Sequence, residues 1–211
     1  MILTILGAPG SGKGTMAGFI STALKIPTIS TGALLRDEIN SGSELGQEID
    51  KLISKGNFVT DEMIIPILKK RIAEKDCANG CILDGFPRNT SQAEKLSEIG
   101  VNLDKALLLK VTDEDVLMRL LGRRECPKCR ATYHITYNAP ATDDVCDKCQ
   151  SKLRMRADDK PEIILKRLSI YHKETEPLIN YFKGQNILVT AKGEITLKNT
   201  RENVFKALEI I

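Results

Sequence analysis

The sequence predicts an α/β fold in which a parallel five-stranded sheet is flanked by helices. Five short apolar runs alternate along the chain with segments of helical periodicity, the pattern of strand–helix–strand units. Two of these runs contain the continuously apolar stretches 107–109 and 187–189, which is typical of strands buried on both faces. A glycine-rich stretch, Gly7–Thr15, joins the first apolar run to the first helical segment.

The predicted strands are residues 2–6, 27–30, 81–84, 106–111 and 186–190. Helices are expected at about 16–24, 34–40, 44–54, 60–75, 113–121, 161–181 and 199–209. Ser43 and Gly56 are placed to cap and to end the third of these helices. Pro161 suits a first helical turn, whereas Pro177 should kink or end the helix that contains it. Two segments interrupt the alternation, 31–59 and about 122–159, and both are interpreted as insertions at the edge of the sheet.

The overall composition excludes several classes of protein. With 211 residues, 42% hydrophobic and 28% charged, the chain can form one α/β domain with insertions. A net charge of +3 and an aromatic content of 4% argue against nucleic acid as a partner. The chain starts without a basic leader, and no apolar run approaches the ~18 residues of a membrane span. We therefore expect a cytoplasmic protein without a membrane partner.

The stretch Gly7–Thr15 has the sequence and the context of a phosphate-binding loop. Glycines let backbone N–H groups curl around phosphate oxygens, and the following helix N-terminus adds its dipole. Lys13 supplies a charge that can reach the outer phosphates. The usual pattern, G-x-x-x-x-G-K-[ST], has a Mg²⁺-binding hydroxyl after the lysine, but Gly14 stands there and Thr15 follows. A turn that binds nothing is the alternative, which the lysine among several small residues disfavours.

Four cysteines in the second insertion predict a metal site. Two C-x-x-C pairs, Cys126/Cys129 and Cys146/Cys149, can turn four thiolates toward one point. Four protein ligands complete a tetrahedron, so a structural metal is expected, with zinc as the default and iron also compatible. Disulfides or redox catalysis are the alternatives, disfavoured by a reducing cytosol and by the spacing. His134 lies between the pairs and is expected to pack rather than to bind metal.

A cysteine ribbon can also indicate nucleic-acid binding. Here, however, the arginines cluster at the base of the insertion, in Gly122-Arg123-Arg124 and Arg154-Met155-Arg156. That position would place their charge over the phosphate loop rather than on an outward face. A lid over a nucleotide is therefore the preferred interpretation.

Taken together, these motifs make the chain resemble an adenylate kinase of the long bacterial type, a nucleoside monophosphate kinase with the P-loop NTPase fold. The motifs run in the family order over nearly the whole chain and comprise Gly7–Thr15, Ser30-Thr31-Gly32-x-x-x-Arg36, Asp84-Gly85-Phe86-Pro87-Arg88-x-x-x-Gln92, Gly122-Arg123-Arg124, the four cysteines, and Arg156-Ala157-Asp158-Asp159 with Arg167 beyond. Gly-Lys-Gly-Thr in the phosphate loop is itself typical of this family. Ala33 and Asn89 depart from the family's common Asp and Thr, and neither is assigned to the chemistry.

The resemblance implies the reaction ATP + AMP ⇌ 2 ADP with Mg²⁺, carried out by a monomer. It also implies a core formed by residues 1–29, 60–121 and 160–211, an AMP-binding insertion at 30–59, and a zinc-binding lid at 122–159 that closes over the substrates. The residues suit this reaction on their own terms, because phosphoryl transfer needs cations and positioning more than a covalent nucleophile.

The resemblance assigns roles residue by residue. Catalytic roles fall to Lys13, Asp84, Arg88, Arg123, Arg156 and Arg167, with Asp84 orienting Mg²⁺ through water. The expected ATP site comprises Gly10, Ser11, Gly12, Lys13, Gly14, Thr15, Arg119, Arg123, Thr132, Tyr133 and Ile195. The expected AMP site comprises Thr31, Arg36, Asn57, Phe58, Val59, Gly85, Phe86, Pro87, Arg88, Gln92, Arg156 and Arg167. For any one motif arginine, a surface salt bridge is the alternative role.

Two alternatives to this activity remain. A kinase for another nucleoside monophosphate would share the loop and the arginines, although Thr31 and Gln92 favour AMP. A P-loop switch or a zinc-ribbon nucleic-acid binder would belong to another class, and the matched arginines and low net charge disfavour it.

Overall fold

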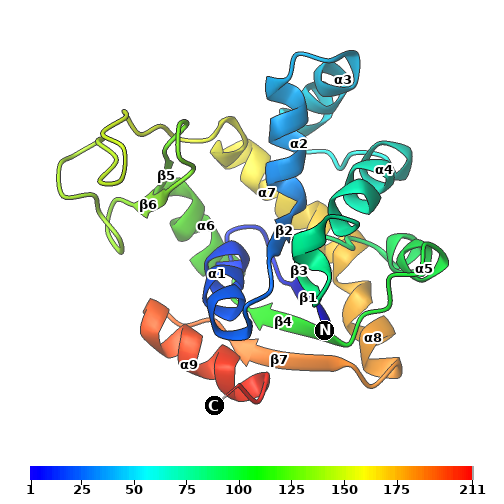
Figure 1. Ribbon diagram of the computed structural model, residues 1–211. Helices are drawn as coiled ribbons and strands as arrows, with labels where there is room; N and C mark the ends of the chain where they lie inside the picture. Colours follow the sequence, from blue (N-terminus) through cyan, green and yellow to red (C-terminus); the bar gives the residue numbers. More distant parts are fainter. Residues whose placement is uncertain (211) are drawn as a thin grey trace.

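A five-stranded parallel sheet forms the centre of the molecule, as predicted. The computed structural model describes residues 1–210, and its strands lie in the order β2-β3-β1-β4-β7 (Figure 1). Their bounds are Ile2–Leu6 (β1), Thr28–Ser30 (β2), Cys81–Asp84 (β3), Lys105–Lys110 (β4) and Leu188–Lys192 (β7). All five predicted strands are confirmed; β4 is displaced by one residue toward the N-terminus and β7 by two residues toward the C-terminus.

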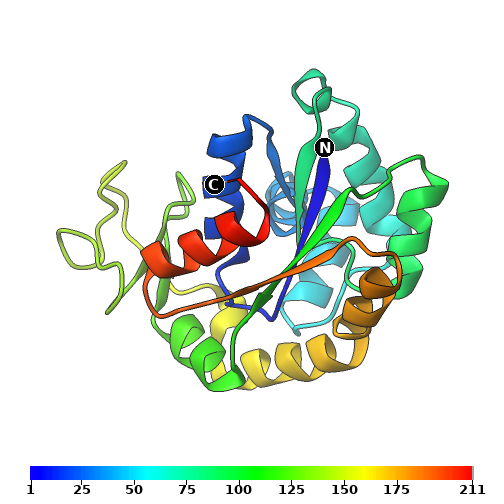
Figure 2. The ribbon, with the colours of Figure 1, turned by 90° about the horizontal axis from the view of Figure 1, so that it is seen from below.

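Alternate residues of the strands point to opposite faces of the sheet, and each face is covered by helices. On one face, Leu3 and Leu107 pack with α1 (Lys13–Leu24) and α9 (Leu197–Ala207). On the other, Leu6 and Leu108 pack with α5 (Thr90–Glu98) and α8 (Pro177–Gly184). Figure 2 shows these two helical layers on either side of the strands. Burial on both faces explains the continuously apolar stretch 107–109 of β4, but 187–189 was wrongly expected to be buried in the same way, because β7 is an edge strand and its Leu188 and Val189 are only partly buried.

The first insertion is a helical arm that rises from the end of β2. It contains α2 (Thr31–Asn40) and α3 (Glu44–Ile53), and α4 (Asp61–Ile72) brings the chain back to the sheet (Figure 1). Ser43 caps α3 as predicted, its hydroxyl accepting the Gly46 N–H at 2.9 Å. Buried side chains of α2, α3 and α4 join those of β2 and β3 in one cluster, which fixes the root of the arm to the sheet.

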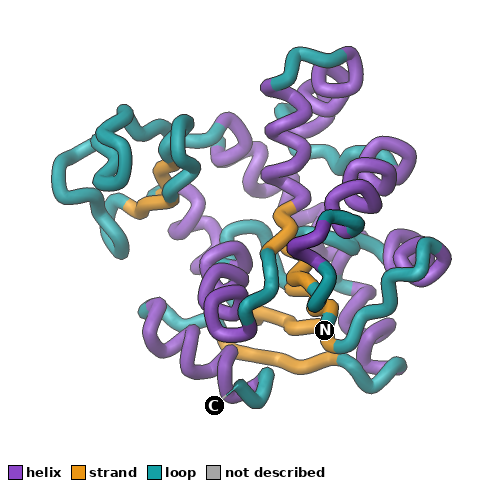
Figure 3. Tube along the Cα trace, viewed as in Figure 1, coloured by secondary structure: helices purple, strands orange, loops and turns teal. Residues whose placement is uncertain are grey.

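The cysteine-rich insertion follows α6 (Asp113–Leu121) and is largely loop (Figure 3). Two short antiparallel strands, β5 (Arg123–Glu125) and β6 (Thr132–His134), form its base. A 3₁₀ turn, η2 (Ala157–Asp159), returns the chain to the sheet domain. Arg130 of this insertion donates a hydrogen bond to Asp37 of α2 (Nη1–Oδ2, 3.0 Å), so the two insertions touch each other.

The helical segment after Pro161 differs in detail from the prediction. It comprises α7 (Pro161–Ile170), a π-helical turn, η3 (Tyr171–Thr175), and α8. Pro177 does not end the helical path, because the chain widens just before it and the Glu176 N–H reaches the Tyr171 carbonyl (2.9 Å). A wider turn relieves the clash that a proline ring makes with the carbonyl four residues earlier.

Two further elements were not predicted in place. Helix α5 has too weak a helical pattern to be separated from the loop before it. The helix predicted to reach residue 75 ends at Ile72, and η1 (Lys75–Cys77) follows, because the Arg71 guanidinium folds back onto the carboxylate of Asp76 (2.7 Å). Among residues 1–210, none of the helices combines the length and apolarity that crossing a bilayer requires.

Candidate active site

The motif residues converge at the carboxyl ends of three neighbouring strands. The glycine-rich loop leaves β1, Thr31 follows β2, and Asp84 and Gly85 close β3. Because these strands are parallel and adjacent, their carboxyl ends open onto one edge of the sheet, where ligands bind in open α/β folds. The Thr31 hydroxyl ties two of these ends together by donating to the Gly85 carbonyl (3.0 Å).

The loop backbone takes a shape that only glycine permits at two positions. Gly7 has φ 144°, and a Cβ there would lie 2.6 Å from the Leu109 carbonyl oxygen. Gly10 has φ 78°, and a Cβ there would lie 2.6 Å from the Leu120 side chain. The loop is thus pressed against β4 and α6, and its N–H groups lead directly into the N-terminus of α1, an anion-binding arrangement.

Lys13 is enclosed by the loop it follows. Its ammonium donates to the carbonyl oxygens of Gly7 (2.7 Å) and Ala8 (2.8 Å). The pKa of Lys13 is lowered to about 8, chiefly by burial and also by nearby arginines, while the charge of Asp84 opposes the shift. Burying this charge without an anionic partner costs free energy, which is typical of a site that binds an anionic ligand.

The Asp84 carboxylate lies close to the backbone of Gly14. A Cβ at position 14 would lie 3.2 Å from the Asp84 carboxylate oxygen Oδ2, so the space used by a hydroxyl side chain in other loops is taken by this carboxylate. An oxygen ligand is therefore present at the same place but comes from the end of β3. Carboxylate oxygens of this kind suit Mg²⁺.

Arginines from four different parts of the chain surround this point. Burial lowers the pKa of Arg88 to about 10 and that of Arg156 to about 9, with repulsion from neighbouring arginines as the next cause. Burial also lowers the pKa values of Arg36 and Arg167, against the opposing charge of Asp158. The buried Nε of Arg36 has no hydrogen-bond partner among residues 1–210. An excess of buried positive charge with an unused donor indicates an anionic ligand.

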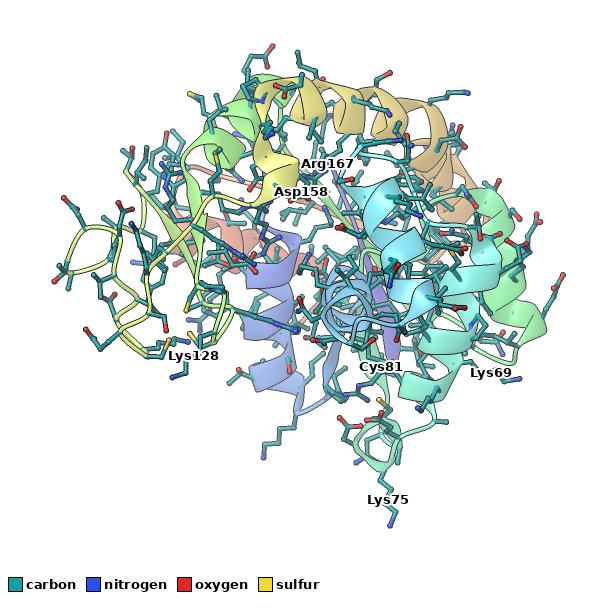
Figure 4. All side chains as sticks on the ribbon, turned by 90° about the horizontal axis from the view of Figure 1, so that it is seen from above. Lys69, Lys75, Cys81, Lys128, Asp158 and Arg167 are labelled. Carbon is teal, nitrogen blue, oxygen red and sulfur yellow. The ribbon has the colours of Figure 1, made fainter. Side chains whose placement is uncertain are left out.

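Acidic residues hold the arginines at the base of the cysteine-rich insertion and at the start of α7 in place. Asp159 is fully buried and accepts a two-pronged contact from Arg123 (Nε–Oδ2 2.8 Å, Nη2–Oδ1 2.6 Å). Arg167 pairs with Asp158 at 2.9 Å, and Figure 4 shows these two side chains beside each other where the cysteine-rich insertion leads into α7. Arg156 pairs with Glu125 of β5. Asp158 and Asp159 of the motif Arg156-Ala157-Asp158-Asp159 thus both pair with arginines.

A small pocket opens next to the arginines, between the helical arm and β3. Its lining is formed by Thr31, Leu35, Val59, Ile64, Gly85, Phe86, Arg88 and Gln92. Six of these residues were predicted to bind AMP. Leu35 and Ile64 were not, because an apolar residue on the inner face of a helix has the same pattern whether it lines a pocket or fills a core. Arg88 also lies over the ring of Phe58, 4.8 Å from its centroid.

Arg119 of α6 links the glycine-rich loop to the segment that follows β7. It donates to the backbone carbonyls of Ser11 and Glu194, both at 2.9 Å. Ile195, next to this contact, is 70% exposed. Glu194 was missed from the sequence, because a backbone contact leaves no signal in the residue type.

The lid residues predicted to contact ATP lie differently from each other. Thr132 is exposed on β6, whereas the Tyr133 ring is buried in the lid. The Tyr133 hydroxyl lies 3.4 Å from the Cys146 sulfur and accepts the Asp147 N–H at 2.9 Å. Tyr133 therefore supports the cysteine cluster, and a nucleotide contact by either residue stays a prediction.

The four lid cysteines gather as the spacing predicted. Their sulfur atoms all lie within 4.8 Å of one another, with Cys126–Cys149 at 3.3 Å and Cys129–Cys146 at 3.4 Å. These separations are far longer than an S–S bond and close to the edge of about 3.8 Å expected for a Zn–thiolate tetrahedron. The donor set thus fits a thiophilic metal. His134 instead stacks on Tyr137 (4.4 Å between ring centroids), as expected for a packing residue.

Comparison with known proteins agrees with this geometry. A family model for adenylate kinase matches residues 5–187. The chain belongs to the adenylate kinase family. It is 47% identical over 212 residues to a protein named adenylate kinase from Acetivibrio thermocellus, covering 99% of this chain and 98% of that protein. It is 45% identical to proteins of the same name from Caldicellulosiruptor saccharolyticus and Clostridium tetani, with both chains covered in full.

One departure from the family pattern has a structural explanation. Asn89 is the N-cap of α5, and its side-chain oxygen accepts the Gln92 N–H at 2.9 Å. Asparagine caps a helix at least as well as the threonine that is common in the family. This substitution therefore preserves the local structure that presents Gln92.

Proposed function

We propose that this protein is an adenylate kinase that transfers the terminal phosphoryl group of ATP to AMP, giving two ADP. The observation that carries the proposal is the meeting of two sites at one group of cations. The glycine-rich loop with Lys13 suits a nucleoside triphosphate, and the pocket beside Arg88 suits a nucleoside monophosphate. Both open onto the carboxyl ends of adjacent strands, so the two phosphates would meet there.

The chemistry proposed for these residues is positioning and charge stabilisation. The loop N–H groups and Lys13 would hold the donor phosphates, while Arg36 and Arg88 would hold the acceptor phosphate. Arg123, Arg156 and Arg167 would gather on the transferred group, whose three oxygens carry the developing charge. Mg²⁺ bound with ATP supplies further charge neutralisation, and Asp84 is the residue that would orient it.

We assign the three parts of the chain accordingly. Residues 1–29, 60–121 and 160–211 would form the core, residues 30–59 the AMP-binding insertion, and residues 122–159 the lid. Binding of both substrates would neutralise the arginine cluster and draw the lid over the site. The contact between Arg130 and Asp37 supports this, because it already joins lid and insertion across the opening.

The metal in the lid is proposed to be structural. Four thiolates leave no open position for a substrate, and the lid has a small apolar cluster of its own, so the metal would supply much of its folding energy. Zinc is the first choice, and iron is the alternative that the donor set allows. We further propose a cytoplasmic monomer that does not bind nucleic acid.

A coupled assay tests the activity. Formation of ADP from ATP is measured with AMP, CMP, UMP or GMP as acceptor, with and without Mg²⁺. AMP is expected to be the preferred acceptor. Absence of turnover with every monophosphate would refute a kinase function, and a preference for another monophosphate would change the substrate.

Two arginine variants make the assay specific to the site. Arg88→Met is expected to lower kcat/KM for AMP by at least about a hundredfold, because it removes a charged partner of a phosphate. Arg201→Met is the matched control. Arg201 lies over the rings of Phe19 and Phe205 on the far face of α1 and α9 and should leave activity unchanged.

A further inference from the structure

Gln92 is held by two protein partners on opposite ends of its amide. The side chain is only 3% exposed and lines the pocket beside Arg88. Its oxygen Oε1 accepts the backbone N–H of Arg88 (2.8 Å), and its nitrogen Nε2 donates to the carboxylate oxygen Oδ1 of Asp61 (2.8 Å). Asp61 is the first residue of α4 and belongs to no motif singled out from the sequence.

The chemistry of these partners determines which way the amide faces. A backbone N–H can only donate, so it requires the oxygen of the amide. An ionised carboxylate can only accept, so it requires the NH₂ group. A rotation of the amide by half a turn would set donor against donor at Arg88 and acceptor against acceptor at Asp61. Both contacts are largely out of solvent, where such mismatches are costly.

Asp61 is itself fixed by a third residue. The Lys95 ammonium donates to the second carboxylate oxygen of Asp61 at 2.7 Å. Burial alone would raise the pKa of Asp61, but the hydrogen bonds from Lys95 and Gln92 outweigh it and lower the pKa. The carboxylate therefore stays ionised at neutral pH and cannot become a donor.

The two contacts leave one hydrogen on Nε2 and one lone pair on Oε1 for a ligand. A 6-aminopurine offers a matching pair, the N6 amino donor and the N1 acceptor. A 6-oxopurine offers the reverse, an oxygen acceptor and an N1–H donor, and would need the amide turned round.

We propose that Asp61 is a positioning residue that locks the Gln92 amide so that the acceptor pocket takes a 6-aminopurine monophosphate and rejects a 6-oxopurine monophosphate. This inference rests on the proposed function, in which Gln92 faces the base of the acceptor nucleotide. Asp61 would act through Gln92 and would not touch the substrate.

The test compares AMP with IMP, which differ at the purine 6-position and in the proton on N1. In Asp61→Asn, the Lys95 ammonium demands the new side-chain oxygen, so the amide NH₂ of residue 61 faces the Gln92 NH₂ group. The Arg88 N–H still requires the Gln92 oxygen, so the two partners now oppose each other and the amide is no longer fixed in the orientation that suits a 6-aminopurine. The ratio of kcat/KM for AMP to that for IMP is expected to fall roughly tenfold or more, chiefly through KM for AMP.

Two further variants serve as controls. Lys95→Met keeps the carboxylate and should keep the ratio of the wild type. The double variant Asp61→Asn/Lys95→Met frees the residue-61 amide to turn its oxygen toward Gln92, so it should recover part of the lost ratio. A purely structural role of Asp61 would lower kcat/KM for both nucleotides alike, and a ratio unchanged in Asp61→Asn would overturn the proposal.

A measurement on the unaltered protein gives a second, independent test. In ¹⁵N-resolved NMR spectra of the wild type, one side-chain proton of Gln92 should be shifted downfield of the other glutamine amides by its bond to the carboxylate. A Gln92 amide without this shift would overturn the lock even if Asp61→Asn failed to fold. A wild type that uses neither AMP nor IMP would instead refute the proposed function on which the inference rests.

Discussion

Replacing Lys13 by methionine should abolish catalysis without destabilising the protein. Methionine keeps most of the aliphatic stem and removes the ammonium that lies against the Gly7 and Ala8 carbonyls. In the folded state, burial and neighbouring arginines hold the pKa of Lys13 at about 8, compared with 10.5 in an unfolded chain. The charge is therefore a cost to folding that the site retains for its chemistry.

The size of this cost follows from the pKa difference. At 1.36 kcal/mol per unit, a fall from 10.5 to about 8 corresponds to about 3 kcal/mol at neutral pH. The variant also loses the hydrogen bonds that Lys13 donates to two carbonyl groups, and each loss lowers its free energy of unfolding by about 1 kcal/mol. These losses offset part of the gain. The free energy of unfolding of Lys13→Met at neutral pH should thus equal that of the wild type or exceed it by up to about 2 kcal/mol.

The dependence on pH is a sharper test than the value at one pH. Between about pH 8 and 10.5 the unfolded chain holds a proton on Lys13 that the folded protein has lost. The free energy of unfolding of the wild type therefore rises with pH across this window, relative to the variant. Groups other than Lys13 titrate in both proteins and cancel in the difference.

Urea unfolding at about pH 7.5 and about pH 10, followed by circular dichroism, measures this difference. From the lower to the higher pH, the free energy of unfolding of the wild type should rise by about 2 to 3 kcal/mol relative to that of the variant. A difference that stays constant with pH, or a variant that is much less stable at pH 7.5, would refute the view that Lys13 is held at a cost. Turnover by the variant at the wild-type rate would refute its catalytic role.

Three other changes have definite expected outcomes. Gly14→Ser should lower kcat for ADP formation about tenfold, because a Cβ at this position lies 3.2 Å from the Asp84 carboxylate and would displace it; an unchanged rate would contradict that role. Hydrogen bonds to Glu176 and Asp113 raise the pKa of His172, so its stabilising ion pairs are fully present below pH 6.5 and are lost as pH rises through the raised pKa. His172→Gln should accordingly be most destabilising in acid when urea unfolding is compared at about pH 5.5 and pH 8.5, and a constant difference would count against the pairs. A strong metal chelator should lower the melting temperature seen by calorimetry, since four gathered thiolates would then repel one another; an unaltered scan would show that the lid holds no structural metal.

The sequence located the five strands because each contains a short apolar core and lies between segments of helical periodicity. It located the phosphate loop and the cysteine cluster because their chemistry depends on residues close together in the chain. The π-helical turn before Pro177 was out of reach, since a proline restricts the local backbone without stating how neighbouring turns adjust.

Features encoded by neighbouring residues could be predicted from the sequence, whereas contacts between distant segments required the folded chain. Residue types and spacing were sufficient for the fold class, the phosphate-loop motif and the gathering of the four cysteines, and the family resemblance pointed to the arginines. That the Asp84 carboxylate fills the space beside Gly14, that Leu35 and Ile64 line the pocket, and that Asp61 faces Gln92 depended on packing between distant segments. Asp61 and Gln92 are 31 residues apart, and their contact exists because α4 and α5 contribute to the same apolar cluster beside β2 and β3. A contact of this kind is set by the arrangement of whole elements, and no local pattern in the sequence records it.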